Sequence, residues 1–236
     1  MQLPDVNSKS YIIRLGHVNV KFDEKEVLSD VSLDVRKGDF IAITGPNGGG
    51  KTTLLRVILK LLKPVSGSVE YYKEGEIVEK LSVGYLPQKN MIDSRFPISV
   101  KDVVRSGLMR DNGLFARISK EDMYRADMMI EQLGLAKHAE QTLGTLSGGQ
   151  MQRALLGRAL ISTPEVIVLD EPLSYVDKQF ENQIYKTISD IAPNSTILLV
   201  SHEMTSIAPM ANRHIIVDRT IHNCHASHHF VISECD

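Results

Sequence analysis

The pattern of apolar and polar positions predicts strands in the first part of the chain, followed by a helix. Residues 11–22 and 27–35 alternate apolar and polar side chains on either side of a polar break, which is typical of two antiparallel strands. Residues 40–44 form a nearly continuous apolar run, as expected for a strand buried on both faces. Residues 52–62 have helical apolar spacing until Pro64 ends the pattern.

The rest of the chain continues with strands and helices in alternation. Residues 67–86 predict further strands, and the period becomes helical between about residues 99 and 160. Beyond that section we expect core strands at residues 166–169, 196–200 and 213–218. Helices are expected between them, at residues 178–190 and 204–211. Strands that alternate with helices predict an α/β fold with a parallel sheet. The helical middle section would form a subdomain inserted into it.

Composition and charge narrow the class of protein. The chain has 236 residues, of which 42% are hydrophobic and 24% charged, as in ordinary globular proteins. Because no apolar run reaches the roughly 18–20 residues that span a bilayer, and no signal-peptide pattern is present, we expect a cytoplasmic protein. The net charge of -2, without a basic block, argues against nucleic-acid binding. Cys224 and Cys235, both near the C-terminus, form no disulfide framework.

The glycine-rich run at residues 45–52 carries the strongest chemical signal. It reads Gly-Pro-Asn-Gly-Gly-Gly-Lys-Thr and joins a predicted buried strand to a predicted helix, the context of a phosphate-binding loop. Glycines let backbone N–H groups converge on phosphates, and the helix N-terminus adds a favourable dipole. Lys51 would neutralise phosphate oxygens, and the Thr52 hydroxyl would bind Mg²⁺. The residues expected to bind ATP here are Gly45, Pro46, Asn47, Gly48, Gly49, Gly50, Lys51, Thr52 and Thr53.

Two acidic residues follow the apolar run at residues 166–169. Ligands bind outside the carboxyl ends of strands in such sheets, so Asp170 and Glu171 are expected to face the phosphate loop. Asp170 suits the Mg²⁺ shell, usually through water. Glu171 is placed to polarise the attacking water, as a general base or by orienting it.

The run Leu146-Ser147-Gly148-Gly149-Gln150, in the same chain as the phosphate loop, resembles the nucleotide-binding subunit of ATP-binding-cassette (ABC) systems. The resemblance covers almost the whole chain. It implies a P-loop NTPase (RecA-like) core with an antiparallel β subdomain and an inserted α-helical subdomain. The implied parts are one ABC ATPase domain at residues 10–236, a helical subdomain at about 95–160, an N-terminal extension at 1–9 and a C-terminal tail at 220–236.

The resemblance also assigns residues around the nucleotide. Gln88, in Tyr85-Leu86-Pro87-Gln88, matches the glutamine loop, which touches Mg²⁺ and the water. His202 matches the switch histidine that contacts the γ-phosphate. Phe22 matches the aromatic residue that stacks on adenine, although an ordinary strand-end aromatic gives the same pattern.

Two segments of the resemblance imply a dimer. Ser147 can cap a helix whose N-terminal N–H groups form an anion site. In the family this signature, here Ser147, Gly148, Gly149 and Gln150, binds the γ-phosphate of ATP held by the opposite subunit. Ser174 and Asp177 match a dimer-contacting loop. A homodimer, or a pair of ATPase subunits, would then enclose two ATP molecules; a plain helix cap with a flexible Gly-Gly turn is the alternative.

Within the ABC group, the helical section looks like the ATPases of zinc, manganese and iron uptake systems. The matching segments are residues 96–100, 102–104, 107, 113–115 and 119–122. The resemblance implies a peripheral ATPase on the cytoplasmic face of the cytoplasmic membrane. Its partners would be an integral membrane permease and, indirectly, an extracytoplasmic substrate-binding protein. Siderophore and haem importers, a soluble ABC protein of DNA repair or translation, and a non-hydrolysing ATP-binding module are the alternatives.

The C-terminal tail offers borderline metal ligands at short spacing. They are His222, Cys224, His225, His228 and His229. Such ligands suit Zn²⁺, which predicts a cytoplasmic metal sensor that adjusts ATPase activity. The alternative is a polar tail with chance histidines.

Overall fold

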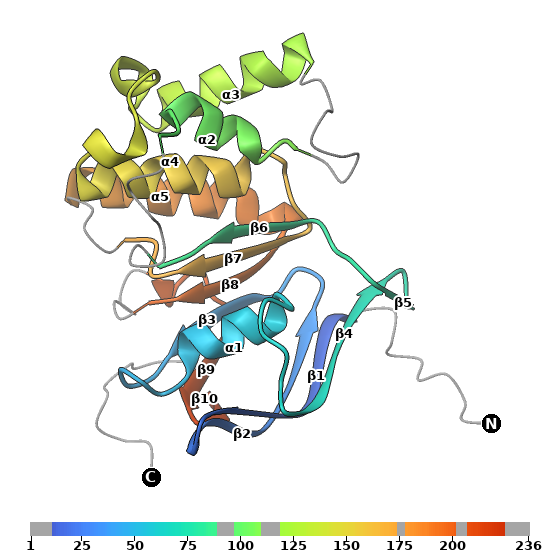
Figure 1. The fold of residues 1–236 in the computed structure, drawn as a ribbon. Coiled ribbons are helices and arrows are strands. Elements are labelled where there is room, and N and C mark those ends of the chain that lie inside the picture. Colours follow the sequence, from blue (N-terminus) through green and yellow to red (C-terminus); the bar gives the residue numbers. More distant parts are fainter. Residues whose placement is uncertain (1–10, 89–96, 110–118, 174–177, 202–206, 225–236) are drawn as a thin grey trace. The chain divides into compact units, whose positions relative to one another are not determined.

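The computed structural model describes residues 11–88, 97–109, 119–173, 178–201 and 207–224 (Figure 1). The chain forms two compact units. The first contains residues 1–81 and 192–236, and the second contains residues 82–191. Within the described ranges, no helix is long and apolar enough to cross a membrane.

The first unit contains an antiparallel sheet with the strand order β2-β1-β4-β5. Its strands are β1 (Tyr11–Phe22), β2 (Lys25–Arg36), β4 (Ser66–Lys73) and β5 (Glu76–Val78). Apolar residues that alternate along β1 and β2 form its buried face, and Leu15 lies opposite Leu33 there. This is the antiparallel pairing that the alternating pattern predicts.

A mostly parallel set of strands completes the first unit. Strand β3 (Phe40–Thr44) lies between β8 (Thr196–Val200) and β9 (Arg213–Asp218) and is parallel to both. Strand β10 (Thr220–Cys224) pairs with β9 in the antiparallel direction. Strand β8 is buried along its whole length, as its continuous apolar run predicts.

Helix α1 (Lys51–Ile58) follows the glycine-rich loop and ends earlier than predicted. Lys60 has a φ of 54°, and its N–H donates to the Val57 carbonyl over 2.9 Å. The N–H of Leu61 donates to the Arg56 carbonyl, also over 2.9 Å. These two bonds form a Schellman motif, which closes the helix. The predicted end at residue 62 is therefore wrong, because apolar spacing alone does not show where the backbone turns into the left-handed region.

A buried tyrosine holds the end of α1. The Tyr71 hydroxyl of β4 donates to the Ile58 carbonyl over 2.7 Å. Lys60 Nζ lies 3.9 Å from the centroid of the same ring, within cation–π distance. Burial raises the pKa of Tyr71 to about 12. The hydroxyl therefore stays protonated and serves as a permanent donor to the helix.

Tyr71→Phe is expected to lower the free energy of unfolding by about 1–2 kcal/mol, because it leaves the buried Ile58 carbonyl without this donor. Tyr72→Phe is the matched control, since the Tyr72 hydroxyl bonds the side chain of Glu70, which water can solvate instead. We expect the control to change stability by less than about 0.5 kcal/mol. Chemical denaturation of the two variants and the wild type measures both effects. Equal losses in the two variants would contradict the role given to Tyr71.

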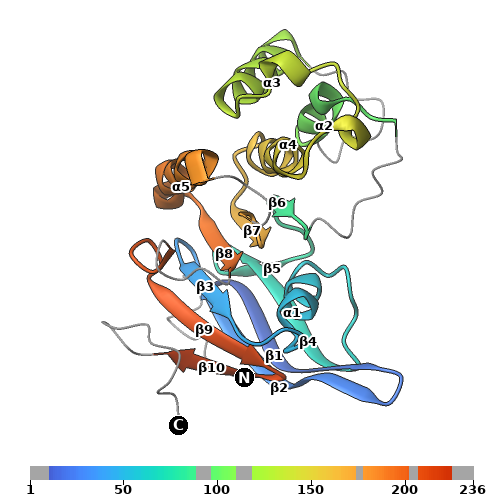
Figure 2. The same cartoon turned by 90° about the vertical axis from the view of Figure 1, so that its left-hand side faces the viewer.

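The second unit contains a parallel strand pair and a set of helices (Figure 2). Strand β6 (Val83–Leu86) pairs with β7 (Val166–Asp170) in the parallel direction. The helices are α2 (Val100–Ser106), α3 (Lys120–Gln132), α4 (Gly148–Leu160) and α5 (Lys178–Ile191). Short 3-10 turns are η3 (Ala136–His138) and η4 (Leu143–Thr145), and η5 (Ala192–Asn194) follows α5 in the first unit. Helix α4 packs against α2 and β6.

Two further segments differ from the expected pattern or are only partly described. Residues 220–224, predicted as the start of a tail, form strand β10, which continues from β9 after Arg219, a residue with a φ of 59°. Their mixed polar composition gives no strand signal, and pairing with β9 decides their conformation.

Of the helix predicted at residues 204–211, the described part is a helical turn in which Met210 and Ala211 both donate to the Ile207 carbonyl. The N-terminal extension lies outside the described residues.

Candidate functional site

The glycine-rich loop is shaped by close contact with the end of β9. Gly45 has a φ of 137°, and a Cβ atom there would lie 2.0 Å from the Val217 carbonyl oxygen. The N–H of Arg219 donates to the Gly49 carbonyl over 2.8 Å. Only glycine fits at residue 45, because any side chain would collide with the backbone of β9. The loop is therefore held by tertiary contacts as well as by its own sequence.

Lys51 points back into the loop. Its side chain is buried, and Nζ donates to the carbonyls of Gly45 and Pro46 over 2.8 and 2.9 Å. A buried ammonium group is strongly disfavoured unless polar partners surround it. Here the loop supplies such partners and keeps a positive charge at the start of α1, the position that a phosphate group requires.

The first turn of α1 is open to an anion. Gly50 occupies the N-cap with a φ of 105°, and no side chain caps the helix. A Cβ atom at Gly50 would lie 2.8 Å from both Leu28 and the Val27 carbonyl of β2. Thr52 and Thr53, the remaining predicted ligands, lie half-buried in this first turn. The glycine cap, the N-terminal amides and Lys51 together fit a phosphate group.

Phe22 lies at the end of β1, on the hairpin that continues into β2. Its side chain is 45% exposed, which is high for a large aromatic residue and leaves its ring available for stacking. Val27 and Leu28 of the same hairpin pack on Gly50, so the hairpin that carries Phe22 contacts the loop. The adenine-stacking role stays a prediction.

The carboxylate pair lies at the C-terminal end of β7, where Asp170 is the last residue of the strand and Glu171 follows it. Asp170 is fully buried at the end of the strand. Glu171 is half-buried and has a φ of 53°, a left-handed conformation that costs a non-glycine residue about 1–2 kcal/mol. The turn at Glu171 therefore directs its side chain away from the line of the strand.

Gln88 and Glu171 are brought together in the second unit. Gln88 Nε2 lies 3.3 Å from Glu171 Oε2 and donates a hydrogen bond to it. Gln88 follows β6 and Glu171 follows β7, and the parallel pairing of these strands places both chain exits at one edge. An amide and a carboxylate in contact are two groups that can orient a water molecule.

The signature run begins helix α4, as predicted. Ser147 is the N-cap, and its hydroxyl accepts a hydrogen bond from the Gln150 N–H over 3.3 Å. The Gln150 side-chain oxygen in turn accepts from the Ser147 N–H over 2.9 Å. This reciprocal capping box fixes the start of the helix that carries Gly148 and Gly149.

Two functional candidates on α4 have no counterpart in the sequence analysis. Gln152 is almost fully buried, and its Nε2 donates to the Glu171 carbonyl over 3.2 Å. Arg153 donates to the Leu133 carbonyl over 2.9 Å and lies 3.6 Å from the ring centroid of Phe180. Gln152 thus links helix α4 to the turn at Glu171. The only sequence signal is two polar residues inside an otherwise apolar stretch of helix.

Several predicted residues fall outside the described ranges. They are Ser174 and Asp177 of the dimer-contacting loop, His202, and the tail histidines His225, His228 and His229. The described tail residues His222 and Cys224 lie on β10, where Cys224 is directly opposite His214 of β9. No group of three or more metal-binding side chains occurs among the residues that the structure describes.

Protonation of the half-buried His214 side chain lowers the stability of the folded state. Its Nε2 lies 2.7 Å from Thr44 Oγ1, and burial lowers the pKa of His214. The folded state therefore prefers the neutral imidazole. As pH falls, the unfolded chain binds the proton first, near its ordinary pKa of about 6.5. The contribution of His214 to stability is thus complete above about pH 6.5 and is lost as pH falls below it.

We expect the melting temperature of the wild type to fall more steeply than that of His214→Gln between about pH 7 and pH 5.5, because only the wild type has this buried imidazole to protonate. Thermal unfolding at several pH values measures the two slopes. His17→Gln removes an exposed histidine paired with Asp30 and controls for general histidine loss. Parallel curves for the wild type and His214→Gln would contradict the assignment.

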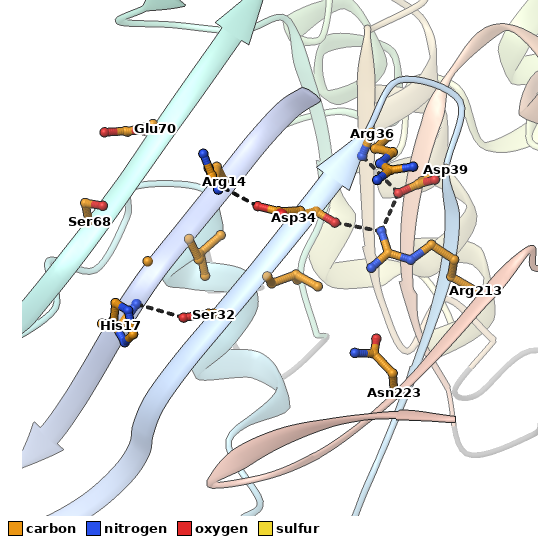
Figure 3. Close-up of a pocket in the computed structure, with 13 residues that line it drawn as sticks. Arg14, His17, Ser32, Asp34, Arg36, Asp39, Ser68, Glu70, Arg213 and Asn223 are labelled. Carbon is orange, nitrogen blue, oxygen red and sulfur yellow. Dashed lines mark hydrogen bonds and ion pairs between the residues drawn. The ribbon is translucent and has the colours of Figure 1, made fainter. Parts of the chain in front are cut away.

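A groove of about 870 Å³ opens elsewhere in the first unit (Figure 3). Arg213 Nη1 donates to Asp39 Oδ2 and to the Asp34 carbonyl, each over 2.6 Å. Arg14 lies 3.0 Å from the Asp34 carboxylate. These bonds connect β1, β2 and β9. None of the predicted ATP-binding residues lines this groove.

Comparisons with known proteins agree with this site. Residues 28–174 match the family model described as ABC transporter. The zinc uptake system ATP-binding protein ZurA of Listeria innocua is 34% identical over 215 residues, which cover 89% of this chain and 84% of that protein. The manganese transport system ATP-binding protein MntB of Bacillus subtilis is 36% identical over 193 residues, covering 81% and 77%. The solved dimeric cassette MJ0796 has a TM-score of 0.77 and 25% identity, covering 89% of this chain and 96% of that one.

The α/β fold and the phosphate-binding loop define a P-loop NTPase, which confirms the predicted fold class. The chain belongs to the ABC transporter family, as the match over residues 28–174 shows. It is an ABC ATPase that uses ATP and Mg²⁺ and works as a pair of ATPase subunits with a membrane permease.

Proposed function

We propose that the chain is the ATP-hydrolysing subunit of an importer for a metal ion, with zinc or manganese as the first candidates and iron as the third. The contact between Gln88 and Glu171 carries the ATPase part of this proposal, since it provides a carboxylate and an amide at one strand edge. The names of the relatives ZurA and MntB, a zinc uptake and a manganese transport ATP-binding protein, support the cargo. An iron-siderophore or haem importer is the runner-up.

The loop residues would bind and neutralise the nucleotide. Lys51 would exchange its bonds to the loop carbonyls for the β- and γ-phosphate oxygens, while the backbone amides from residue 45 to residue 53 hold the phosphates. Phe22 would stack on adenine. Thr52, Asp170 and Gln88 offer hydroxyl, carboxylate and amide oxygens, the donor types that Mg²⁺ prefers. When bound, Mg²⁺ would offset the charge of the phosphates.

Glu171 would prepare the attacking water. Its carboxylate accepts the Gln88 amide, and its backbone carbonyl accepts the Gln152 amide, so both ends of the residue are fixed. A fixed carboxylate near a water molecule can orient it and accept its proton. His202, two residues beyond the end of β8 in the sequence, would contact the γ-phosphate.

The second subunit would complete each site. Ser147, Gly148, Gly149 and Gln150 would bind the γ-phosphate of ATP held by the opposite subunit, with the α4 N-terminus as the anion site. Ser174 and Asp177 would contact that subunit. ATP binding would then close the dimer, and hydrolysis would reopen it.

The wider assembly would stand at the cytoplasmic face of the cytoplasmic membrane. An integral permease would carry the metal ion, and an extracytoplasmic protein would deliver it. Import is the proposed direction because two relatives, ZurA of Listeria innocua and ZnuC of Bacillus subtilis, are named for zinc uptake.

The cargo is tested by uptake in cells that lack the gene for this chain, complemented with the wild type or with Glu171→Gln. Labelled zinc, manganese, ferric siderophore and haem are supplied separately. We expect loss of zinc or manganese uptake, restored by the wild type alone. Loss of siderophore or haem uptake would support the runner-up. Unchanged uptake of all four would refute a role in metal import.

We propose the C-terminal metal sensor separately. Cys224 lies opposite His214 and two residues from His222, and four of the five predicted ligands are histidines. Zinc affinity of the full chain is compared with that of a variant in which His225, His228 and His229 are replaced by Asn. Equal affinity would end the proposal, whereas a loss of tight binding and of zinc-dependent ATPase change would support it.

A further inference from the structure

His138 contacts the signature residue Gln150. The histidine ends the short turn η3, and its Nε2 lies 3.1 Å from Gln150 Nε2 at the first turn of α4. Its Nδ1 lies 3.0 Å from the side-chain oxygen of Gln141. Both ring nitrogens of this half-buried histidine are thus bonded to uncharged side-chain amides.

The capping box fixes the orientation of the Gln150 amide. The Ser147 backbone N–H is a donor, so the group that faces it over 2.9 Å must be the Gln150 oxygen. The amide nitrogen of Gln150 therefore points at His138. Because an amide nitrogen only donates, His138 Nε2 must be an acceptor.

This arrangement selects one form of the histidine. With Nε2 as the acceptor, the proton lies on Nδ1 and is donated to Gln141. A protonated His138 would carry hydrogens on both nitrogens and would set two donors against each other at Gln150. Rotation of the Gln150 amide would relieve that conflict only by placing its nitrogen against the Ser147 N–H. In either case one hydrogen bond is lost, either between His138 and Gln150 or between Gln150 and the Ser147 N–H.

We propose that neutral His138 is a positioning residue for the signature, holding Gln150 and the Ser147 cap in the geometry that receives ATP from the opposite subunit. The proposal rests on the in-trans role of the signature given above. His138 does not touch the nucleotide, so it acts only through Gln150.

Charged groups on the surrounding elements are paired, stacked on a ring or exposed to solvent. Lys101 of α2 pairs with Glu140 over 3.1 Å, next to the η3 turn. Arg153 of α4 is stacked on Phe180. Lys137 on the turn and Glu131 on α3 are exposed. The two side-chain hydrogen bonds of His138, to Gln141 and Gln150, involve none of these charges.

The test uses the full chain in a Glu171→Gln background, where hydrolysis of bound ATP is expected to be slow. Sedimentation measures the dimer dissociation constant in saturating MgATP at about pH 8. His138→Leu removes the acceptor and keeps bulk. His138→Gln places an amide oxygen at about the distance of Nε2 and does not titrate. His17→Gln, in the other unit, is the control for loss of a histidine.

At about pH 8 we expect His138→Leu to weaken the dimer about fivefold to tenfold, the effect of one lost hydrogen bond, and His138→Gln to stay within about twofold of its parent. ATP binding to the monomer should not change. The His17→Gln control should match its parent. An equal dimer constant for His138→Leu and its parent would overturn the proposal, as would a His138→Gln dimer as weak as that of His138→Leu.

The same experiment distinguishes failure of the in-trans role of the signature from failure of the positioning role of His138. If the Glu171→Gln chain binds ATP and never dimerises, alone or with its permease, the in-trans role of the signature is wrong. If it dimerises and the His138 variants behave alike, only the positioning role is wrong.

Discussion

Glu171→Gln is expected to lower the ATPase rate by about 10²–10⁴-fold while ATP binding stays intact, because the amide keeps the shape of the carboxylate and cannot accept a proton from water. The Gln88 contact of 3.3 Å and the fixed backbone carbonyl of residue 171 argue that the variant keeps its local geometry. The loss should therefore be in kcat, with little change in KM for ATP.

The measurement is MgATP turnover together with size-exclusion chromatography in ATP. We expect a dimer that persists in Glu171→Gln and is transient in the wild type. Glu140→Gln, which removes an exposed carboxylate paired with Lys101, is the control and should keep the wild-type rate. A Glu171→Gln variant with full activity would show that another group activates the water. If the isolated wild type is inactive, the same comparison is made in the complex with its permease.

Lys51→Ala is expected to weaken MgATP binding at least about 30-fold, since it removes a buried, hydrogen-bonded charge that would otherwise meet the phosphates. The effect should be on affinity, because Lys51 lies at the start of α1 and its Nζ is within the loop. Hydrolysis would fall in parallel, as fewer subunits hold nucleotide.

Calorimetric titration with MgATP measures the affinity, and Lys63→Ala supplies an exposed lysine as the control. Thermal unfolding without nucleotide checks that the variant is folded, because Lys51 also bonds the Gly45 and Pro46 carbonyls. Unchanged affinity in a folded Lys51→Ala chain would refute the assignment of the phosphate site.

Local chemistry explains which parts of the site could be predicted. Ser147 and Gln150, which cap the helix by reciprocal hydrogen bonds, lie three residues apart, so the sequence itself specifies the capping box. The glycine-rich loop and Lys51 are likewise consecutive in the sequence, so a local motif is enough to predict them. Strand β8 is apolar from Ile197 to Val200 and buried along its length, as expected for a short strand with both faces covered.

Long-range contacts explain what the sequence pattern missed. Helix α1 ends at Ile58 with Tyr71 on its last carbonyl, whereas its apolar spacing continues to residue 62. Residues 220–224 become a strand through pairing with β9. In both places a partner distant in the sequence decides the outcome, and periodicity does not contain that information.

The sequence by itself determined the fold class, the phosphate-binding loop, the carboxylates after β7 and the helix cap of the signature, because each depends on neighbouring residues or on a regular period. Only the tertiary structure decided that Gln88 meets Glu171 and that His138 holds Gln150. Residues 88 and 171 stand 83 positions apart, and the parallel pairing of β6 with β7 brings them together. Such contacts depend on how strands and turns pack, and packing is a property of the folded chain as a whole.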